Sequence, residues 1–120
     1  MKILIFGGSG FLGKNLANYL QKSKHKITIF DKKNIFKRNK KINFIQGNIL
    51  NYKKVLRASK NQDIIYNFAG ISDIGDAMKN PILTSKINIL GSIYTLDAAV
   101  KNKVKRYIFA SSIYVLSRQG

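Results

Sequence analysis

The sequence has 120 residues, which suits one domain with one core but is small for an enzyme that must hold both a cofactor and a substrate. It contains no cysteine and no apolar run long enough to cross a bilayer, which excludes a disulfide framework, a thiolate metal site and a membrane span. Without such a run or a leader-like start, we expect a cytoplasmic protein. The net charge of +17 suggests a polyanionic partner, but lysine far outnumbers arginine and is spread over nearly every predicted loop and helix, so we expect no specific nucleic-acid site.

An apolar run at residues 3–6 has the length and β-branched content of a buried strand and leads directly into a glycine-rich turn. A helical stripe follows, in which apolar residues recur every fourth position at Leu12, Leu16 and Leu20. Strand, turn and helix in this order are the context that a dinucleotide fingerprint requires. The glycines are Gly7, Gly8, Gly10 and Gly13, and their spacing fits both G-x-G-x-x-G and G-x-x-G-x-x-G.

The glycines of this turn predict a pyrophosphate site. One glycine lets the backbone turn sharply, one lets a pyrophosphate approach the main chain, and Gly13 lets the helix lie close to the strand. The free N–H groups and the positive end of the helix dipole would then face the phosphates. The alternative is a turn that needs glycine for steric reasons only.

The longer glycine spacing resembles that of the short-chain dehydrogenase/reductase superfamily. The sequence Gly-Gly-Ser-Gly-Phe-Leu-Gly at residues 7–13 resembles the motif of its extended branch, the NAD-dependent epimerases and dehydratases. The resemblance implies NAD as the cofactor and nucleotide-linked sugars as the substrate class. It also implies hydride transfer from a sugar carbon to NAD, followed by return of the hydride.

A second strand at residues 26–30 ends at Asp31, close to the ~20-residue offset from the glycine turn at which an acidic side chain meets the adenosine ribose. A carboxylate there accepts hydrogen bonds from the ribose hydroxyls and repels a 2′-phosphate, which favours NAD over NADP. The neighbouring Lys32 and Lys33 complicate this preference, because basic residues at this point can accommodate the 2′-phosphate. The alternative is a solvated aspartate that ends a strand.

A third strand at residues 42–45 is followed by Gly47, Asn48 and Ile49. This element resembles the family's Gly-Asp-Ile segment, in which the acidic residue accepts a hydrogen bond from the adenine amino group and the aliphatic residue packs on the ring. Asn48 replaces the aspartate, and its amide oxygen can still accept that bond. A helix with Tyr52 and Val55 on its apolar side is expected next.

A fourth strand at residues 63–70 ends in Asn67, Phe68, Ala69 and Gly70. Its small residues match the family segment that closes the cofactor site on the ribose and nicotinamide side, although a strand that simply ends in glycine is the alternative. The loop over residues 71–80, with Ser72, Asp73 and Asp76, would border the substrate.

A helix is predicted from Pro81, which suits the first helical turn, to about residue 101. It has two apolar stripes, a band wider than one sheet face would cover. The family's Asn-x-x-Gly motif matches Asn88 to Gly91, and the resemblance implies a homodimer through this helix. The second stripe could equally be covered by the remainder of the subunit. The stripes are Leu83, Ile87, Leu90 and Tyr94, and Ile89, Ile93, Leu96 and Val100.

A fifth strand at residues 105–110 leads into a segment that resembles the family's Ser-Ser-x-x-Val-Tyr-Gly element. By this resemblance Ser112 is the catalytic serine, which donates to the reacting oxygen of the substrate. The family's proton-transfer pair is Tyr-x-x-x-Lys, and no tyrosine of this sequence has a lysine four positions later. We therefore expect the 120-residue chain alone to bind a dinucleotide without turning over substrate.

The predicted fold is a Rossmann-like, doubly wound parallel sheet of five strands in the order 3-2-1-4-5, forming one NAD(P)-binding domain over residues 1–120 that lacks the catalytic helix. The predicted function is the NAD-binding part of a nucleotide-sugar epimerase or dehydratase, with NADP less favoured and no metal. The alternatives are a non-catalytic NAD(P) sensor or scaffold and a basic nucleic-acid-binding domain. The predicted cofactor residues are Gly7, Gly10, Phe11, Leu12, Gly13, Asp31, Asn48, Ile49, Phe68, Ala69, Gly70 and Asn88.

Overall fold

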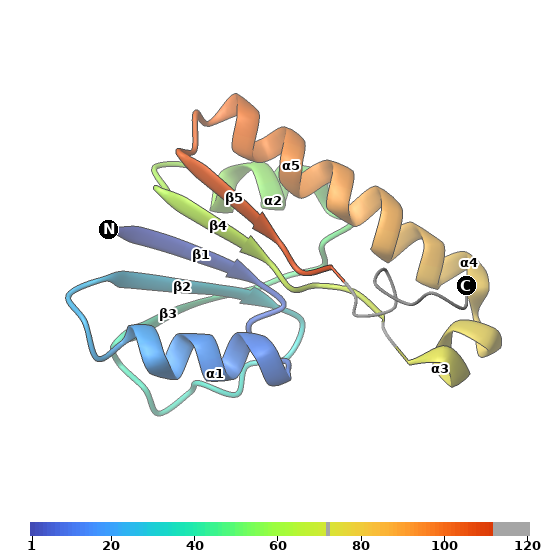
Figure 1. Cartoon of the computed structure of the whole chain (residues 1–120), viewed down its shortest axis with the longest axis horizontal. Helices are drawn as coiled ribbons and strands as arrows, with labels where there is room; N and C mark the ends of the chain where they lie inside the picture. The colour runs from blue at the N-terminus through green and yellow to red at the C-terminus, as the bar shows by residue number, and fades with distance from the viewer. Residues whose placement is uncertain (72, 112–120) are drawn as a thin grey trace, which may run out of the picture.

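A five-stranded sheet organises the chain (Figure 1), which a computed structural model describes over residues 1–71 and 73–111. The strands lie in the order β3-β2-β1-β4-β5, and all adjacent pairs are parallel. This confirms the strand order predicted from the sequence. The strands span Lys2–Phe6 (β1), Lys26–Asp31 (β2), Ile42–Gln46 (β3), Ile64–Asn67 (β4) and Arg106–Phe109 (β5).

Helices cover both faces of the sheet, because strand side chains alternate between two apolar clusters. The helical segments span Phe11–Leu20 (α1), Tyr52–Ala58 (α2), Ile74–Lys79 (α3), Pro81–Ser85 (α4), Lys86–Leu90 (η1) and Gly91–Lys101 (α5). Ile3 and Ile5 of β1 lie in the cluster under α1, whereas Leu4 and Phe6 lie in the cluster under α2 and α5. No helix in the described part of the chain is both long and apolar enough to cross a membrane.

In the first turn of α1, the burial of one residue differs from the prediction. Leu12, which was expected in the buried stripe, is 56% exposed. Ala17 is fully buried and Leu16 and Leu20 are half-buried, as expected. The stripe prediction was wrong at Leu12 because Gly13 occupies the buried position of this turn, where the helix lies directly against the glycine turn.

A short helix, α3, occupies part of the stretch predicted as a loop at residues 71–80. The Asp73 carboxylate caps it by accepting a hydrogen bond from the Asp76 N–H at 2.9 Å. An aspartate immediately before helical residues is an N-cap signal, so the sequence did carry a mark of this helix. No residue of α3 is buried, which explains why no apolar pattern indicated it.

The helix predicted from residue 81 to residue 101 forms, but it contains a π-helical turn, η1. Pro81 stands in the first turn as predicted, and the Asn80 side-chain oxygen accepts a hydrogen bond from the Leu83 N–H at 3.1 Å. Single π turns inside helices are frequent at functional sites. This one carries Ile87 and Asn88, which both lie beside the pocket described below.

A polar cluster joins α2 to α5 on the surface. The Tyr52 hydroxyl donates to the Asp97 carboxylate and accepts a hydrogen bond from the Lys101 ammonium at 2.9 Å, while Lys101 pairs with Asp97 at 3.0 Å. The Tyr52 ring also stacks on Tyr94, with 5.1 Å between ring centroids. The hydrogen bond from Tyr52 and the neighbouring Lys101 lower the pKa of Asp97, and the bond to Tyr52 and the Asp97 charge raise the pKa of Lys101.

Candidate functional site: a pocket at the carboxyl ends of the strands

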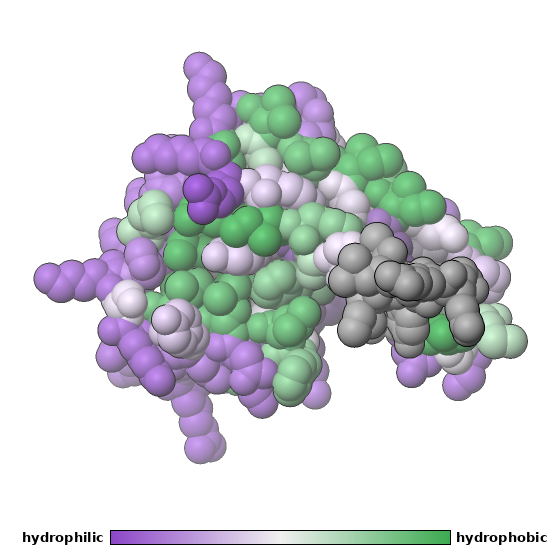
Figure 2. Space-filling view, in the orientation of Figure 1, coloured by the Kyte–Doolittle hydropathy of each residue, from purple (hydrophilic) through white to green (hydrophobic). Residues whose placement is uncertain are grey.

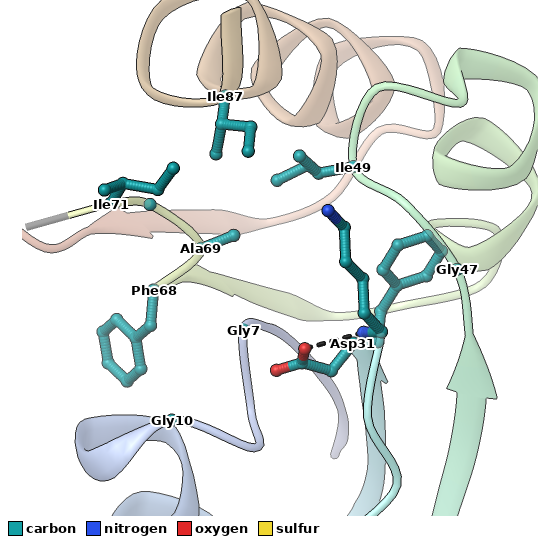
Figure 3. Close-up of a pocket in the computed structure, with 12 residues that line it drawn as sticks. Gly7, Gly10, Asp31, Gly47, Ile49, Phe68, Ala69, Ile71 and Ile87 are labelled. Atoms are coloured by element: carbon teal, nitrogen blue, oxygen red, sulfur yellow. Dashed lines mark hydrogen bonds between the residues drawn. The ribbon is translucent and has the colours of Figure 1, made fainter. Parts of the chain in front are cut away.

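A pocket of about 230 Å³ opens at the carboxyl edge of the sheet (Figure 3). Its lining comes from the last two residues of β2, from the segments that follow β1, β2, β3 and β4, and from η1. It lies where the strand order reverses between β1 and β4, which is the position where open α/β sheets bind ligands. The lining residues are Gly7, Gly10, Phe30, Asp31, Lys32, Gly47, Ile49, Phe68, Ala69, Gly70, Ile71 and Ile87.

The glycine turn packs directly against the end of β4. Gly7 has a φ of +76°, and a Cβ added there would lie 2.6 Å from the Ala69 nitrogen and 2.6 Å from the Phe68 carbonyl carbon. The Gly7 N–H donates to the Phe30 carbonyl oxygen at 2.9 Å, and the Gly10 N–H donates to the Gly7 carbonyl oxygen at 3.2 Å. Only glycine fits at position 7, since both the backbone conformation and the close approach exclude a side chain.

The N-terminus of α1 begins at this turn without a side-chain cap from the described residues. Gly10 is the N-cap residue, and the first turn of the helix has no acidic residue. The first helical hydrogen bond runs from the Lys14 N–H to the Gly10 carbonyl oxygen at 2.9 Å. The N–H groups of Phe11, Leu12 and Gly13 precede that bond, so they are the orphan donors of the helix and suit an anionic ligand.

The Asp31 carboxylate lies at the end of β2 and joins this strand to the glycine turn. One oxygen accepts a hydrogen bond from the Ser9 N–H at 2.9 Å and the other accepts one from the Lys32 N–H at 2.7 Å. Figure 3 shows the carboxylate in the pocket wall next to Gly7, with the bond to the Lys32 amide dashed. Each oxygen keeps a further lone pair for a ligand hydroxyl.

The far end of the pocket is apolar. Gly47 lies against the Phe30 ring, since a Cβ added at Gly47 would lie 2.6 Å from the Phe30 Cζ atom. Ile49 and Ile87 are both buried and line the pocket, and Figure 3 shows them on the same side of it. This arrangement suits a flat apolar group such as a purine ring.

Asn48 lies outside the pocket lining. Its side-chain oxygen accepts a hydrogen bond from the Leu50 N–H at 2.9 Å and so closes a local turn. The residue is exposed beside Ile49, which does line the pocket.

Two asparagine side chains hold the segment that follows β4 by hydrogen bonds to its backbone. The β4 strand ends at Asn67 instead of at Gly70, and the buried Asn67 side chain accepts a hydrogen bond from the Ala69 N–H at 3.1 Å. The Asn88 side chain holds both backbone groups of Ile71: its oxygen accepts from the N–H at 2.7 Å, and its NH₂ donates to the carbonyl oxygen at 2.9 Å. Both polar atoms of Asn88 are engaged in this way, and the neighbouring Ile87 lines the pocket, whereas Asn88 does not.

The structure brings seven of the predicted cofactor residues together in the pocket lining and places the others around it. Phe11, Leu12 and Gly13 form the first turn of α1, Asn48 and Asn88 lie outside the lining, and Ser112 lies outside the described residues. No group of three or more histidines and carboxylates in the described ranges could hold a metal ion. The seven are Gly7, Gly10, Asp31, Ile49, Phe68, Ala69 and Gly70, and the lining residues absent from the predicted set are Phe30, Lys32, Gly47, Ile71 and Ile87.

Comparison with known proteins confirms the resemblance noted in the sequence. A profile of the NAD dependent epimerase/dehydratase family matches residues 3–119. dTDP-D-glucose 4,6-dehydratase from Dictyostelium discoideum is 33% identical over 92% of this chain and 29% of its own length. UDP-glucose 4-epimerase from Yersinia enterocolitica is 30% identical over 96% of this chain and 38% of its own length. The chain thus spans well under half of these two curated relatives.

A solved structure gives the same result for the fold. The UDP-glucose-4-epimerase from Stenotrophomonas maltophila, with bound NAD and formylated UDP-arabinopyranose, is 25% identical and superposes with a TM-score of 0.85. The match covers 99% of this chain and 39% of that one. With its glycine turn and its strand order, and with a family profile matched over nearly all of its length, this chain belongs to the NAD-dependent epimerase/dehydratase family.

Proposed function

We propose that this chain forms the NAD-binding part of an enzyme that epimerises or dehydrates a nucleotide-linked sugar. The observation that carries the proposal is that Gly10, the N-cap residue of α1, and the Asp31 carboxylate line one pocket, so that the N-terminus of the helix begins beside the carboxylate. An anion-binding helix end beside a hydroxyl-binding carboxylate suits the pyrophosphate and the adenosine ribose of a dinucleotide. The names of the relatives support the sugar-nucleotide substrate class.

The residues of the pocket and of the first turn of α1 suit the successive parts of a dinucleotide. The amides of residues 11–13 would bind the pyrophosphate, and the apolar end at Ile49 and Ile87 would hold the adenine. Asn48 lies outside the lining, next to Ile49, and the lone pair that its side-chain oxygen keeps beside the Leu50 N–H bond would accept from the adenine amino group. The segment from Phe68 to Gly70, held in place by Asn88, would lie against the nicotinamide ribose. The pocket volume of about 230 Å³ is below the ~300–1,000 Å³ of typical ligand sites, so part of the cofactor would lie outside it.

Bound NAD would supply hydride transfer, taking a hydride from a sugar carbon and returning it later. We propose NAD over NADP because the Asp31 carboxylate repels a 2′-phosphate. We propose Ser112 as the serine that donates to the reacting oxygen. Because no tyrosine of the chain has a lysine four positions later, the 120 residues alone are expected to bind NAD without turnover.

The first test is a titration of the chain with NAD by isothermal titration calorimetry, alongside thermal unfolding. We expect saturable binding and a rise in the unfolding midpoint that grows with NAD concentration, since NAD binds the folded state. The chain carries a net charge of +17, so any polyanion is expected to adhere to it in a salt-dependent way. Inorganic triphosphate at ~150 mM salt is therefore the control for charge alone. A preparation that is folded by circular dichroism and binds NAD no better than triphosphate would end this proposal.

We further propose that the helix over residues 81–101 forms a homodimer interface. Figure 2 shows apolar side chains along the outer side of α5, and Ile89 and Val100 are 63% and 70% exposed. An apolar stripe of this length is unusual on the surface of a monomer and marks an interaction surface. This is the second predicted stripe, Ile89, Ile93, Leu96 and Val100, and all four residues are exposed, as is Ile82 in α4.

A charge placed in the stripe should separate the dimer. We expect sedimentation velocity to give a dimer for the unmodified chain and a monomer for Ile93→Lys, because a lysine in a closed apolar interface loses its hydration. Ile74→Lys makes the same chemical change at an exposed isoleucine of α3 and should leave the dimer intact. A monomer before any substitution would contradict the interface.

A further inference from the structure

The pocket contains a lysine that the proposed NAD site does not require. Lys32 directly follows Asp31 and is part of the pocket lining. In the part of the chain that the structure describes, the two ion pairs join Lys101 to Asp97 and Lys105 to Asp63. The only bond between Lys32 and Asp31 runs from the backbone N–H of Lys32, so it does not engage the ammonium group. The Lys32 charge is therefore available to a ligand.

The backbone of Lys32 is held in place on both sides. Its N–H donates to the Asp31 carboxylate at 2.7 Å, and its carbonyl oxygen accepts from the Gln46 side-chain NH₂ at 3.1 Å. The next carbonyl, that of Lys33, accepts from the Ser9 hydroxyl of the glycine turn. These bonds connect the end of β2 to β3 and to the glycine turn, so the backbone of Lys32 has a fixed position relative to Asp31 and the turn.

The charges of Asp31 and Lys32 have opposite effects on a phosphate at the 2′ position of the adenosine ribose. A ribose that donates its hydroxyls to Asp31 would carry its 2′ position within reach of both residues. The carboxylate repels a phosphate at that position, and the ammonium attracts it. Lys32 is exposed at the rim, where solvent moderates both effects but does not abolish them.

We propose that Lys32 is a specificity-determining residue that offsets the repulsion between Asp31 and a 2′-phosphate, so that this pocket accepts NADP as well as NAD. The inference rests on the proposed function, since it needs a dinucleotide in this pocket. It predicts that the preference for NAD is modest and depends on the Lys32 charge. The expected contribution of one exposed opposite charge is a change of about fivefold in the dissociation constant.

The experiment titrates NAD and NADP separately into the unmodified chain, Lys32→Gln and Lys60→Gln. Lys60→Gln removes the same charge at the opposite, amino-terminal edge of the sheet, where Lys60 lines a separate groove with Lys2 and Lys26. We expect Lys32→Gln to weaken NADP binding about fivefold and NAD binding less than twofold. The salt dependence of NADP binding should also become shallower in Lys32→Gln alone. Lys60→Gln should change neither the ratio of the NADP and NAD dissociation constants nor the salt dependence of NADP binding.

Two results would overturn the inference without contradicting the proposal that the chain binds NAD. Equal weakening of NAD and NADP in Lys32→Gln would place the ammonium on the diphosphate that both cofactors share, and unchanged binding of both would remove any role for it. Lys32→Arg, which keeps the charge, should retain the unmodified NADP-to-NAD ratio and serves if Lys32→Gln does not fold. If a folded chain binds neither dinucleotide, the proposed function fails together with this inference.

Discussion

Replacing Gly13 with alanine is expected to destabilise the chain by about 2–4 kcal/mol and to abolish dinucleotide binding. A Cβ added at Gly13 would lie 2.4 Å from the Gly8 Cα atom and 2.6 Å from the Gly7 carbonyl oxygen. Both contacts are with backbone atoms, which cannot rotate away as a side chain can. The helix and the glycine turn would have to separate, and that movement displaces the amides proposed to hold the pyrophosphate.

The measurement is urea unfolding followed by circular dichroism, paired with an NAD titration of each variant. Gly10→Ala is the matched control for the unfolding measurement, because a Cβ at Gly10 would meet the Gly7 carbonyl oxygen at an ordinary 3.4 Å and its φ is −78°. We expect Gly10→Ala to cost no more than about 1 kcal/mol, the difference between glycine and alanine at an N-cap. If Gly13→Ala and Gly10→Ala lose the same free energy of unfolding, the close approach at Gly13 is not the cause of the destabilisation.

The core of this fold could be predicted because the signals for it are local. The strands at residues 3–6, 26–30 and 42–45 are short apolar runs with turns on both sides, and the structure extends them by no more than one residue at either end. The glycine turn and Asp31 were predicted to meet in one site, because the carboxyl ends of parallel strands share one edge of the sheet. The Ser9 N–H to Asp31 bond at 2.9 Å is the direct contact between them.

The parts that could not be predicted depend on contacts between distant segments. Nothing near Asn88 in the sequence indicates a π-helical turn, so an ordinary helix was expected and Ile87 was not assigned to the pocket. Leu12 fits the apolar period of α1, yet it is exposed because the close packing of Gly13 against the turn fixes which side of the first turn is buried. Position in the period alone does not determine burial at the end of a helix.

Lys32 is a case in which sequence reasoning noticed the residue but could not place it. Two lysines follow Asp31, and both were equally able to reach a ribose phosphate. The structure separates them, because Lys32 lines the pocket and Lys33 does not. The hydrogen bond from Gln46 to the Lys32 carbonyl oxygen, which contributes to this placement, comes from a neighbouring strand and has no signal next to Asp31.

Replacing Asn67 with leucine is expected to destabilise the fold by about 2–4 kcal/mol, although leucine has a similar volume and is apolar. Asn67 is 1% exposed, and its NH₂ group donates to the Tyr107 hydroxyl at 3.1 Å and the Thr95 hydroxyl at 3.3 Å. Its oxygen accepts from the Ala69 N–H at 3.1 Å. Leucine would leave that amide without its acceptor and place a methyl group against two hydroxyls in the interior.

The loss should be larger than the hydrogen bonds of Asn67 alone suggest, because Thr95 and Tyr107 also bond to each other at 2.8 Å and tie β4 and β5 to α5. Urea unfolding of Asn67→Leu should therefore be compared with Asn43→Leu, the same change at an exposed position of β3, expected within about 0.5 kcal/mol of the unmodified chain. The network also bears on binding, since the Ala69 amide that Asn67 holds is part of the pocket wall. If Asn67→Leu keeps both its stability and its NAD affinity, the segment after β4 is held by Asn88 and packing, without a contribution from this network.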